Sequence, residues 1–349
     1  MTVNDANVLT EIVLPGVVEP SGLQTRVGAL PSPGPGQVLL RVEATGVSFA
    51  EQQMRRGTYF GQPPFPFVPG YDAVGTVAVT GEGVDRLLAG RRFAAVTKVG
   101  SWASHVVVDA AALVAVPDGV DPAEAETVVV NGITAQQMLY RVAHVRAGQT
   151  IVVLGANGGV GSTLVQLARH AGMTVIGTAS TRHHDTVRGL GAIPVDYRDP
   201  HMYRRIAAIA PTGVDAVFDH VGGAGLKQSW RLLRKGGTLV SYGTAALKDG
   251  GGSPQLTYLK LFAQLWMWHL SPNGRSARFY NFWAGERQQE AFRKRMREDL
   301  DAVFALLAQG AIDPQIAARF PLHRAAEALA LAESGSVAGK VILTGRDGL

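Results

Sequence analysis

The sequence contains no cysteine at any of its 349 positions. This absence excludes disulfide bonds, and it excludes every zinc or iron–sulfur site that needs a thiolate ligand. Charged residues are also scarce, at 17% of the chain, whereas hydrophobic residues make up 46%. That balance is not that of a disordered chain, and it favours large buried cores. At this length we expect two domains.

Two further absences bear on location and partners. No apolar run reaches the roughly 18 residues that a membrane-spanning helix needs. Residues 1–10 lack a basic segment followed by an apolar one, so we expect no signal peptide. Together these features predict a soluble, cytoplasmic protein with no membrane partner. The net charge of +5 is mild for this length and does not indicate nucleic-acid binding.

Glycine is abundant, with 42 residues, and one glycine cluster is the most informative segment. The β-rich run Ile151–Leu154 ends in the cluster, and an amphipathic helical pattern then continues to Gly172. A strand, a tight glycine turn and a helix in this order are typical of a dinucleotide-binding βα unit. Gly158 would let the backbone approach a pyrophosphate, and Gly161 would let the helix pack closely on the strand. The predicted phosphate-binding residues are Gly155, Asn157, Gly158, Gly159, Val160 and Gly161.

A glycine-rich turn without a ligand is the alternative interpretation of this loop, since Ala156 stands where the usual motif has its first glycine. The rest of the chain favours the dinucleotide interpretation. Residues up to about 125 carry short alternating strand patterns separated by proline- and glycine-rich loops, which predicts a β-rich domain. Beyond that point, apolar strands alternate with helical stretches. The strands expected there are Ile151–Leu154, Thr174–Thr178, Val214–Asp219 and Gly237–Tyr242. This alternation predicts a parallel, doubly wound α/β sheet.

Several segments outside the glycine cluster carry recognisable motifs. They are Gly46–Tyr59, Pro66–Gly75, Phe218–Gly223, Gly236–Gly243, Ala325–Leu329 and Gly339–Leu343. With the loop Gly155–Gly161 they resemble, in order and spacing, the medium-chain dehydrogenase/reductase superfamily. The resemblance covers nearly the whole chain. It is to the zinc-independent quinone oxidoreductase branch, which includes ζ-crystallin and the VAT-1-like proteins.

The resemblance implies a Rossmann domain inserted into a β-rich, GroES-like catalytic domain. We expect residues 1–126 and 273–349 to form the catalytic domain and residues 127–272 to form the cofactor domain. The final strand, Gly339–Thr344, should return to the first domain. The resemblance also implies a homodimer.

The resemblance assigns further residues to the cofactor. It implies that Thr134, with Asn131 near it, lies beside the nicotinamide. Strand ends later in the cofactor domain should add Val221, Gly243 and Thr244.

The choice between NADH and NADPH can be argued from the second predicted strand. NAD sites usually carry a carboxylate at this strand end, to bind the ribose 2′-hydroxyl. Here the strand runs into Ser180 and Arg182 without a carboxylate, and these residues can bind a 2′-phosphate. Tyr197 matches a tyrosine that the family places near that phosphate. NADPH is therefore the expected cofactor, with Arg182 as a solvated loop residue the alternative.

No metal is expected at the site. Zinc-dependent relatives place a His-Glu pair after the Pro-Gly turn, whereas this chain has Tyr71 and Asp72, and it has no cysteine. Adjacent His183 and His184 lack partners at ligand spacing. Without a Lewis acid, reduction of a quinone or an activated C=C bond is favoured over interconversion of simple alcohols and ketones, since hydrogen bonds can stabilise an enolate.

Two catalytic residues are predicted in the first domain. The resemblance implies that Tyr59 points toward the nicotinamide, although a packed tyrosine that caps the loop is the alternative. Ser48 replaces an asparagine of the family, and Glu51 replaces an aspartate. A serine has a shorter reach than an asparagine, so the family's quinone specificity cannot simply be transferred.

The function predicted is an NADPH-dependent reductase of a small hydrophobic carbonyl substrate, either a quinone or an α,β-unsaturated carbonyl. The alternatives are an enoyl-thioester reductase of the polyketide or fatty-acid type and a non-catalytic cofactor-binding protein.

Two helical stretches admit more than one interpretation. The aromatic stretch 256–270 is either a lid over the substrate or a packed core or dimer interface. The mixed charges of residues 286–309 indicate a solvated helix.

Overall fold

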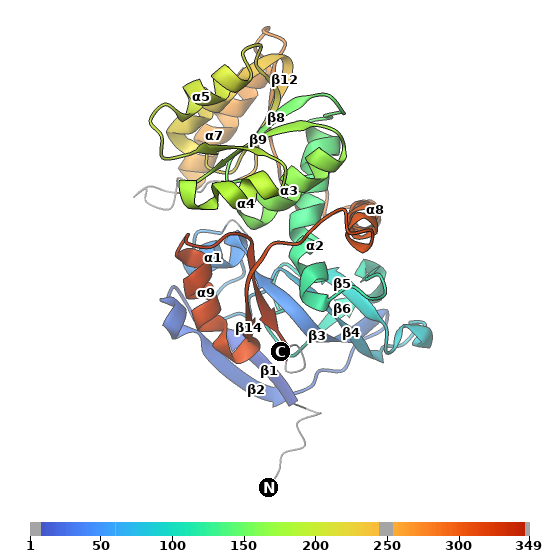
Figure 1. Ribbon diagram of the computed structural model, residues 1–349. Coiled ribbons are helices and arrows are strands. Elements are labelled where there is room, and N and C mark those ends of the chain that lie inside the picture. The colour runs from blue at the N-terminus through green and yellow to red at the C-terminus, as the bar shows by residue number, and fades with distance from the viewer. Residues whose placement is uncertain (1–7, 60, 244–253, 346–349) are drawn as a thin grey trace. The chain divides into compact units, whose positions relative to one another are not determined.

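The computed structural model describes residues 8–59, 61–243 and 254–345. Its contacts divide the chain into two compact units. The first unit combines Met1–Ile133 with Arg287–Leu349, and the second is Thr134–Glu286. The chain therefore leaves the first unit once and returns to it, as the inserted-domain prediction requires. Figure 1 traces both units.

The first unit is built on a seven-stranded sheet whose centre is the long strand β3 (Gln37–Val47). Val38, Leu40 and Val42 alternate along β3 and enter one apolar core, which suits a strand with one face buried. On one side of β3 lie β15 (Lys340–Thr344) and then β14 (Ile316–Pro321). On the other side lie, in order, β4 (Asp72–Thr80), β5 (Arg92–Val96) and β7 (Val114–Ala115). The strand β6 (His105–Asp109) also pairs with β3.

The C-terminal strand β15 pairs antiparallel with β3, so the prediction that it returns to the first domain is confirmed. A two-stranded sheet accompanies the larger one, and four helices complete the unit. These elements are β1 (Val8–Val13), β2 (Gln24–Ala29), α1 (Phe49–Arg55), α2 (Pro122–Gln136), α8 (Gln289–Ala308) and α9 (Ala325–Glu333). The solvated helix predicted within residues 286–309 is α8, and its apolar C-terminal half is partly buried.

The second unit is a doubly wound parallel sheet. Its strands, in spatial order, are β10 (Ile193–Asp196), β9 (Thr174–Ala179), β8 (Thr150–Val153), β11 (Val214–Asp219), β12 (Leu233–Ser241) and β13 (Ser276–Phe279). Every pairing in this sheet is parallel. The order begins at β8 in the middle and winds outward in both directions, which is the dinucleotide-binding topology.

Helices cover both faces of this sheet, as Figure 1 shows. They are α3 (Gly159–His170), α4 (His184–Gly189), α5 (Met202–Ile209), α6 (Leu226–Arg231) and α7 (Pro254–His269). On one face, Val152 and Val217 of the sheet join an apolar cluster with residues of α5, α6 and α7. On the other face, α3 buries Leu164 and Leu167. Both faces of the strands are thus apolar, which explains their continuous hydrophobic runs.

The division between units lies further along the chain than the expected one. We expected the cofactor domain to end at residue 272, whereas the second unit extends to Glu286. The physical reason is β13, which pairs in parallel with β12 and so extends the sheet of the second unit. At the other junction the expected boundary, 126/127, and the observed one, 133/134, both fall within α2.

Among the described residues, no helix combines the length and the apolar character that crossing a membrane requires.

Candidate functional site

The glycine loop lies where the winding of the second unit's sheet changes direction. The loop follows β8. From β8 the sheet extends to β9 and β10 in one direction and to β11, β12 and β13 in the other. Ligands of open α/β sheets bind at this position, outside the carboxyl ends of the strands. The loop leads into α3, whose N-cap is Gly158, a residue without a side chain that could cap the helix. Asn157, Gly159 and Val160 are half-buried around this helix start.

Two glycines of the loop are required by close contacts. Gly155 has φ +67°, and a Cβ there would lie 2.4 Å from Cε1 of His220. A Cβ on Gly161 would lie 2.1 Å from the carbonyl oxygen of Gly155, which shows how closely the helix approaches the turn. Gly158 differs, because its nearest neighbour would be 3.4 Å away. Among the described residues the backbone at Gly158 is therefore open, as a phosphate cradle requires.

Ser180, Arg182 and Tyr197 gather at the carboxyl ends of β9 and β10. The parallel register places Asp196 opposite Ala179, and the Tyr197 amide donates to the Ala179 carbonyl. Ser180 is buried, whereas Arg182 and Tyr197 are exposed. Arg182 also donates from Nε to Nε2 of His183 at 3.1 Å. Of the two predicted phosphate ligands, Arg182 is thus the one accessible to a ligand.

Asp196 also lies at this edge, although no sequence motif marks it. It accepts hydrogen bonds from the Thr181 hydroxyl and from the Arg198 amide, and these bonds lower the pKa of its carboxyl. Asp196 therefore stays ionised and ties the start of the β9 loop to β10. Only the register of two parallel strands brings it beside Thr181, 15 residues earlier in the chain.

The next strand ends supply Val221 and Gly243. Buried Asp219, the last residue of β11, accepts from the amides of Val221 and Gly222 at 2.9 and 2.8 Å. A Cβ on Gly243 would lie 2.6 Å from the His220 carbonyl oxygen. These residues therefore line the same sheet edge as the glycine loop. Thr244 lies outside the described residues.

Asn131 and Thr134 lie on one face of α2, three residues apart, and both are buried. Nδ2 of Asn131 donates to the Thr127 carbonyl at 2.9 Å, so this amide supports its own helix. The two residues fall on either side of the division between units.

In the first unit, Tyr59 is paired with Tyr71. Their hydroxyl oxygens are 2.8 Å apart and their rings meet edge to face, with centroids 6.1 Å apart. Tyr71 is buried and Tyr59 is half-buried. The pair holds the Tyr59 ring in place and gives it a hydroxyl partner, which is a suitable arrangement for donating to a carbonyl oxygen.

Ser48 is the N-cap of α1 and forms a capping box with Glu51. The Ser48 hydroxyl accepts from the Ala50 amide at 3.1 Å, and the Ser48 amide donates to Oε2 of Glu51 at 2.8 Å. Ser48 itself is half-buried, whereas Glu51 is buried. Serine and glutamate therefore have a structural reason to replace the family's asparagine and aspartate at these two positions.

The first unit also contains a buried charge cluster that the sequence does not reveal. Nζ of Lys340 donates to Oδ2 of Asp72 at 3.0 Å and to Oε1 of Glu126 at 2.7 Å. Burial alone would lower the pKa of Lys340, but the two carboxylates together raise it. Burial, followed by the charge of Asp72, raises the pKa of Glu126 well above its usual range. The three residues come from β4, α2 and β15, so no local pattern could reveal them.

Across residues 8–59, 61–243 and 254–345, no group of three or more histidines, aspartates and glutamates is arranged to hold a metal ion.

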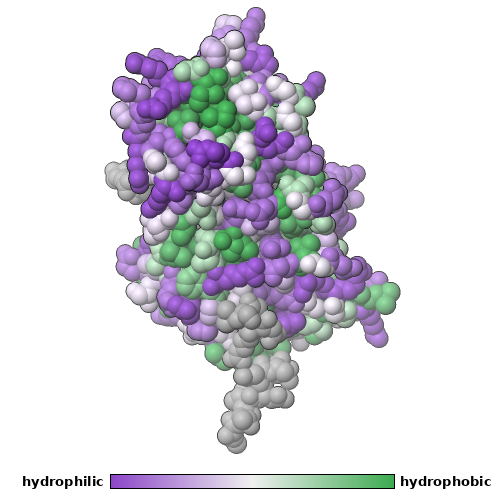
Figure 2. All heavy atoms as spheres, in the orientation of Figure 1, coloured by the Kyte–Doolittle hydropathy of each residue, from purple (hydrophilic) through white to green (hydrophobic). Residues whose placement is uncertain are grey.

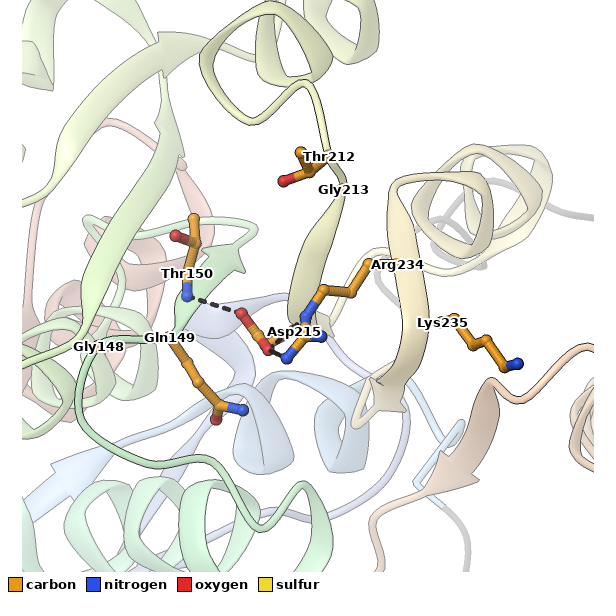
Figure 3. Close-up of a pocket in the computed structure, with 8 residues that line it drawn as sticks. All are labelled: Gly148, Gln149, Thr150, Thr212, Gly213, Asp215, Arg234 and Lys235. Carbon is orange, nitrogen blue, oxygen red and sulfur yellow. Dashed lines mark hydrogen bonds and ion pairs between the residues drawn. The ribbon is translucent and has the colours of Figure 1, made fainter.

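One pocket of about 590 Å³ lies in the second unit, at the opposite end of the sheet (Figure 3). It surrounds the first residues of β8 and β11, where Asp215 accepts from the Thr150 amide at 2.9 Å and from Nε of Arg234 at 2.7 Å. None of the predicted site residues lines this pocket. Since the ligands of such sheets bind at the carboxyl ends of the strands, we do not assign it to the cofactor.

Comparison with known families finds matches to two segments of the chain. Residues 34–118 match the alcohol dehydrogenase GroES-like domain, and residues 190–343 match a family described as zinc-binding dehydrogenase. The rat synaptic vesicle membrane protein VAT-1 homolog is 34% identical over 328 residues, which are 92% of this chain and 80% of that protein.

Two mycobacterial structures are similar along nearly the whole chain. One, described as a quinone oxidoreductase, is 28% identical with a TM-score of 0.78, covering 96% of this chain and 99% of its own. The other, described as complexed with NADPH, is 27% identical with a TM-score of 0.81 and the same coverage.

The glycine contacts predict effects of different size for two substitutions in the loop. Gly161→Ala should lower the free energy of unfolding by about 1–3 kcal/mol, because its methyl group meets the Gly155 carbonyl. Gly158→Ala should change it by less than about 1 kcal/mol, since its Cβ meets nothing closer than 3.4 Å. Urea denaturation of both variants measures the difference. Equal free energies of unfolding for the two variants would show that Gly161 does not lie against the Gly155 carbonyl in solution.

Proposed function

The chain belongs to the medium-chain dehydrogenase/reductase superfamily, as a quinone-oxidoreductase-like oxidoreductase, and we propose that it is an NADPH-dependent reductase that works without zinc. Its substrate in this proposal is a small hydrophobic carbonyl compound, either a quinone or an α,β-unsaturated carbonyl. A cytoplasmic location is part of the same proposal. The observation that carries the cofactor choice is the exposed Arg182 at the end of β9, a strand that ends without a carboxylate of its own.

The second unit fits NADPH through its own residues. The free space above Gly158 and the uncapped start of α3 suit the pyrophosphate. Arg182 would pair with the 2′-phosphate, with Tyr197 and Ser180 beside it. Asp196 lies at the same edge, where its carboxylate accepts from the Thr181 hydroxyl and the Arg198 amide. Val221, Gly243, Asn131 and Thr134 are proposed to border the cofactor, as the sequence analysis expects.

When bound, NADPH supplies a hydride to the substrate. The first unit's task is then to stabilise the negative charge that develops on the substrate oxygen. Tyr59, held by Tyr71, is proposed as one hydroxyl donor and Ser48 as another. Tyr71 and Asp72 stand where zinc-dependent relatives have His and Glu, so this chain offers hydroxyl donors in place of a Lewis acid.

A substrate panel tests the reaction. The protein should oxidise NADPH when given a quinone or an enone, and absorbance of the reduced cofactor follows the rate. Gly158→Ala is the matched control for cofactor binding. Its methyl group would occupy the space proposed for the pyrophosphate, but it meets no other described atom closer than 3.4 Å, so the fold should be kept. A faster rate with a crotonyl thioester than with free enones would instead favour an enoyl-thioester reductase. Tight NADPH binding without turnover of any substrate would contradict the proposal and favour a non-catalytic cofactor-binding protein.

Substitution of Arg182 tests the cofactor choice. Arg182→Ala should raise the KM for NADPH about 10- to 100-fold, because a hydrogen bond to a charged group contributes about 1.5–3 kcal/mol. The KM for NADH should stay within about twofold, since NADH has no 2′-phosphate. Arg188→Ala is the control, as Arg188 is an exposed arginine of α4 that pairs with Asp185. An equal loss of affinity for both cofactors would contradict the assignment.

We also propose that the protein is a homodimer joined through the second unit. The helix α7 buries Leu265 but exposes the apolar side chains of Leu259, Phe262, Trp266 and Met267, and Leu270 directly after the helix is exposed too; these five are 44% to 68% exposed. It packs on β13, the edge strand of the sheet. Figure 2 shows an apolar patch on the drawn face of this unit. An apolar helix face beside a sheet edge suits a self-complementary contact with a second copy.

Light scattering tests this contact. The protein should have twice the mass of one chain, and Trp266→Glu should convert it to a monomer, because a charge would be buried in the interface. Leu87→Glu, at an exposed leucine of the first unit, should leave the mass unchanged. A dimer that persists in Trp266→Glu would place the interface elsewhere.

A further inference from the structure

One oxygen of Glu51 is buried without a partner. The Glu51 side chain is 1% exposed; its Oε2 accepts from the Ser48 amide at 2.8 Å and forms a short hydrogen bond with the Ser48 hydroxyl. Its Oε1 is buried and has no hydrogen-bond partner among the described residues. An ionised carboxylate in this position would leave half of its charge desolvated and unpaired, which is costly. A neutral carboxylic acid would leave only a carbonyl oxygen unpaired.

The surrounding charges also favour the neutral acid. Asp72 on β4 and Glu126 on α2 are both buried, and both contact Nζ of Lys340 on β15. An ionised Glu51 would add a further negative charge near that of Asp72 in a buried site. Burial, followed by the charge of Asp72, raises the pKa of Glu51, and the Ser48 hydrogen bond and Lys340 only partly oppose this.

We propose that Glu51 is protonated in the resting protein and acts through Ser48 as the proton source for the reduction. This inference rests on the proposed function for its substrate, but the protonated Glu51 itself does not. Ser48 is the catalytic residue in this arrangement, because its half-exposed hydroxyl would touch the substrate oxygen. Glu51 is a positioning residue, which sets the direction of the Ser48 proton and replaces it after transfer.

A count of donors and acceptors shows why the protonation state matters. A serine hydroxyl has one proton to donate and two lone pairs to accept with. When Glu51 is ionised, the Ser48 proton is donated to Oε2 and is not available to a substrate. When Glu51 is protonated, its own O–H can donate to Ser48 Oγ, which also accepts from the Ala50 amide. The Ser48 proton is then free to be donated to a third group.

The step balances for an α,β-unsaturated carbonyl. Hydride addition to the β-carbon breaks the C=C π bond and places a negative charge on the carbonyl oxygen as an enolate. That oxygen takes the proton of Ser48 Oγ, and Ser48 takes the proton of Glu51. The products are the enol, which tautomerises to the saturated carbonyl, and a Glu51 carboxylate, which regains its proton from water.

The pH dependence of turnover tests the role. The protonated form of Glu51 is the active one, so kcat should be constant at low pH and fall as pH rises through the raised pKa of Glu51. Glu51→Gln keeps the capping box, but its amide is not acidic and cannot replace the proton that Ser48 gives up. Its kcat should be roughly 100-fold lower, without the alkaline fall, while its KM for NADPH stays within about twofold.

Two matched variants separate this role from a structural one. Ser48→Thr keeps a hydroxyl at the N-cap and should retain the alkaline fall, whereas Ser48→Ala should lose it. Glu126→Gln removes a carboxyl from the same buried cluster without contact to Ser48, and should also retain the fall. A Glu51→Gln protein with a wild-type kcat and an unchanged alkaline fall would overturn the proposal.

Infrared spectroscopy of the protein without cofactor or substrate tests the protonation itself. The wild-type spectrum at neutral pH should contain a protonated carboxyl band that Glu51→Gln lacks and that disappears at alkaline pH. The same band should persist in Glu126→Gln. Identical spectra for wild type and Glu51→Gln would overturn the proposal. If no substrate in the panel is reduced and the band is nevertheless lost in Glu51→Gln, the proposed reaction fails while the protonated Glu51 stands.

Discussion

The ammonium group of Lys340 is the contact on which the first unit depends. It joins Asp72 of β4, Glu126 of α2 and the C-terminal strand β15, three elements that are far apart in the sequence. A buried ion pair adds little net stability compared with apolar residues, but loss of one partner leaves an unpaired buried charge. Each of these elements therefore needs the other two in place. The close packing also explains Gly46, where a Cβ would lie 2.1 Å from Cε of Lys340.

The second unit is organised by a different constraint, close approaches that leave room only for glycine. Gly155, Gly161 and Gly243 each lie where a Cβ would meet other atoms at 2.6 Å or less. These contacts bring the carboxyl ends of β8, β11 and β12 together at one edge of the sheet. The side chains at that edge come from loops, whose chemistry can vary while the strands beneath them keep the shape. The cofactor choice thus depends on a few exposed residues such as Arg182, and the fold does not depend on them.

The sequence predicted those features that local patterns encode. Strands Val214–Asp219 and Thr174–Thr178 are apolar runs, and their positions agree with β11 and β9 within a residue. The short strands β10, β13 and β14 carry no such pattern, because pairing with a neighbour defines them more than composition does. The Lys340 cluster and the contact of Thr181 with Asp196 were missed for the same reason. Both arise from residues that only the tertiary fold brings together.

Two residue pairs of the first unit, Tyr71–Asp72 and Ser48–Glu51, differ from the family pattern, and their effects on its chemistry are linked. Tyr71 and Asp72 replace a His-Glu pair, so a Lewis acid gives way to hydroxyl donors and a carboxylate that pairs with Lys340. Burial, followed by the charge of Asp72, in turn raises the pKa of Glu51. Ser48 is short enough to cap α1 while it contacts Glu51, whereas an asparagine amide could not accept and then pass on a proton. In the proposed arrangement, burial and the charge of Asp72 therefore keep a proton on Glu51, next to the Ser48 hydroxyl that would deliver it.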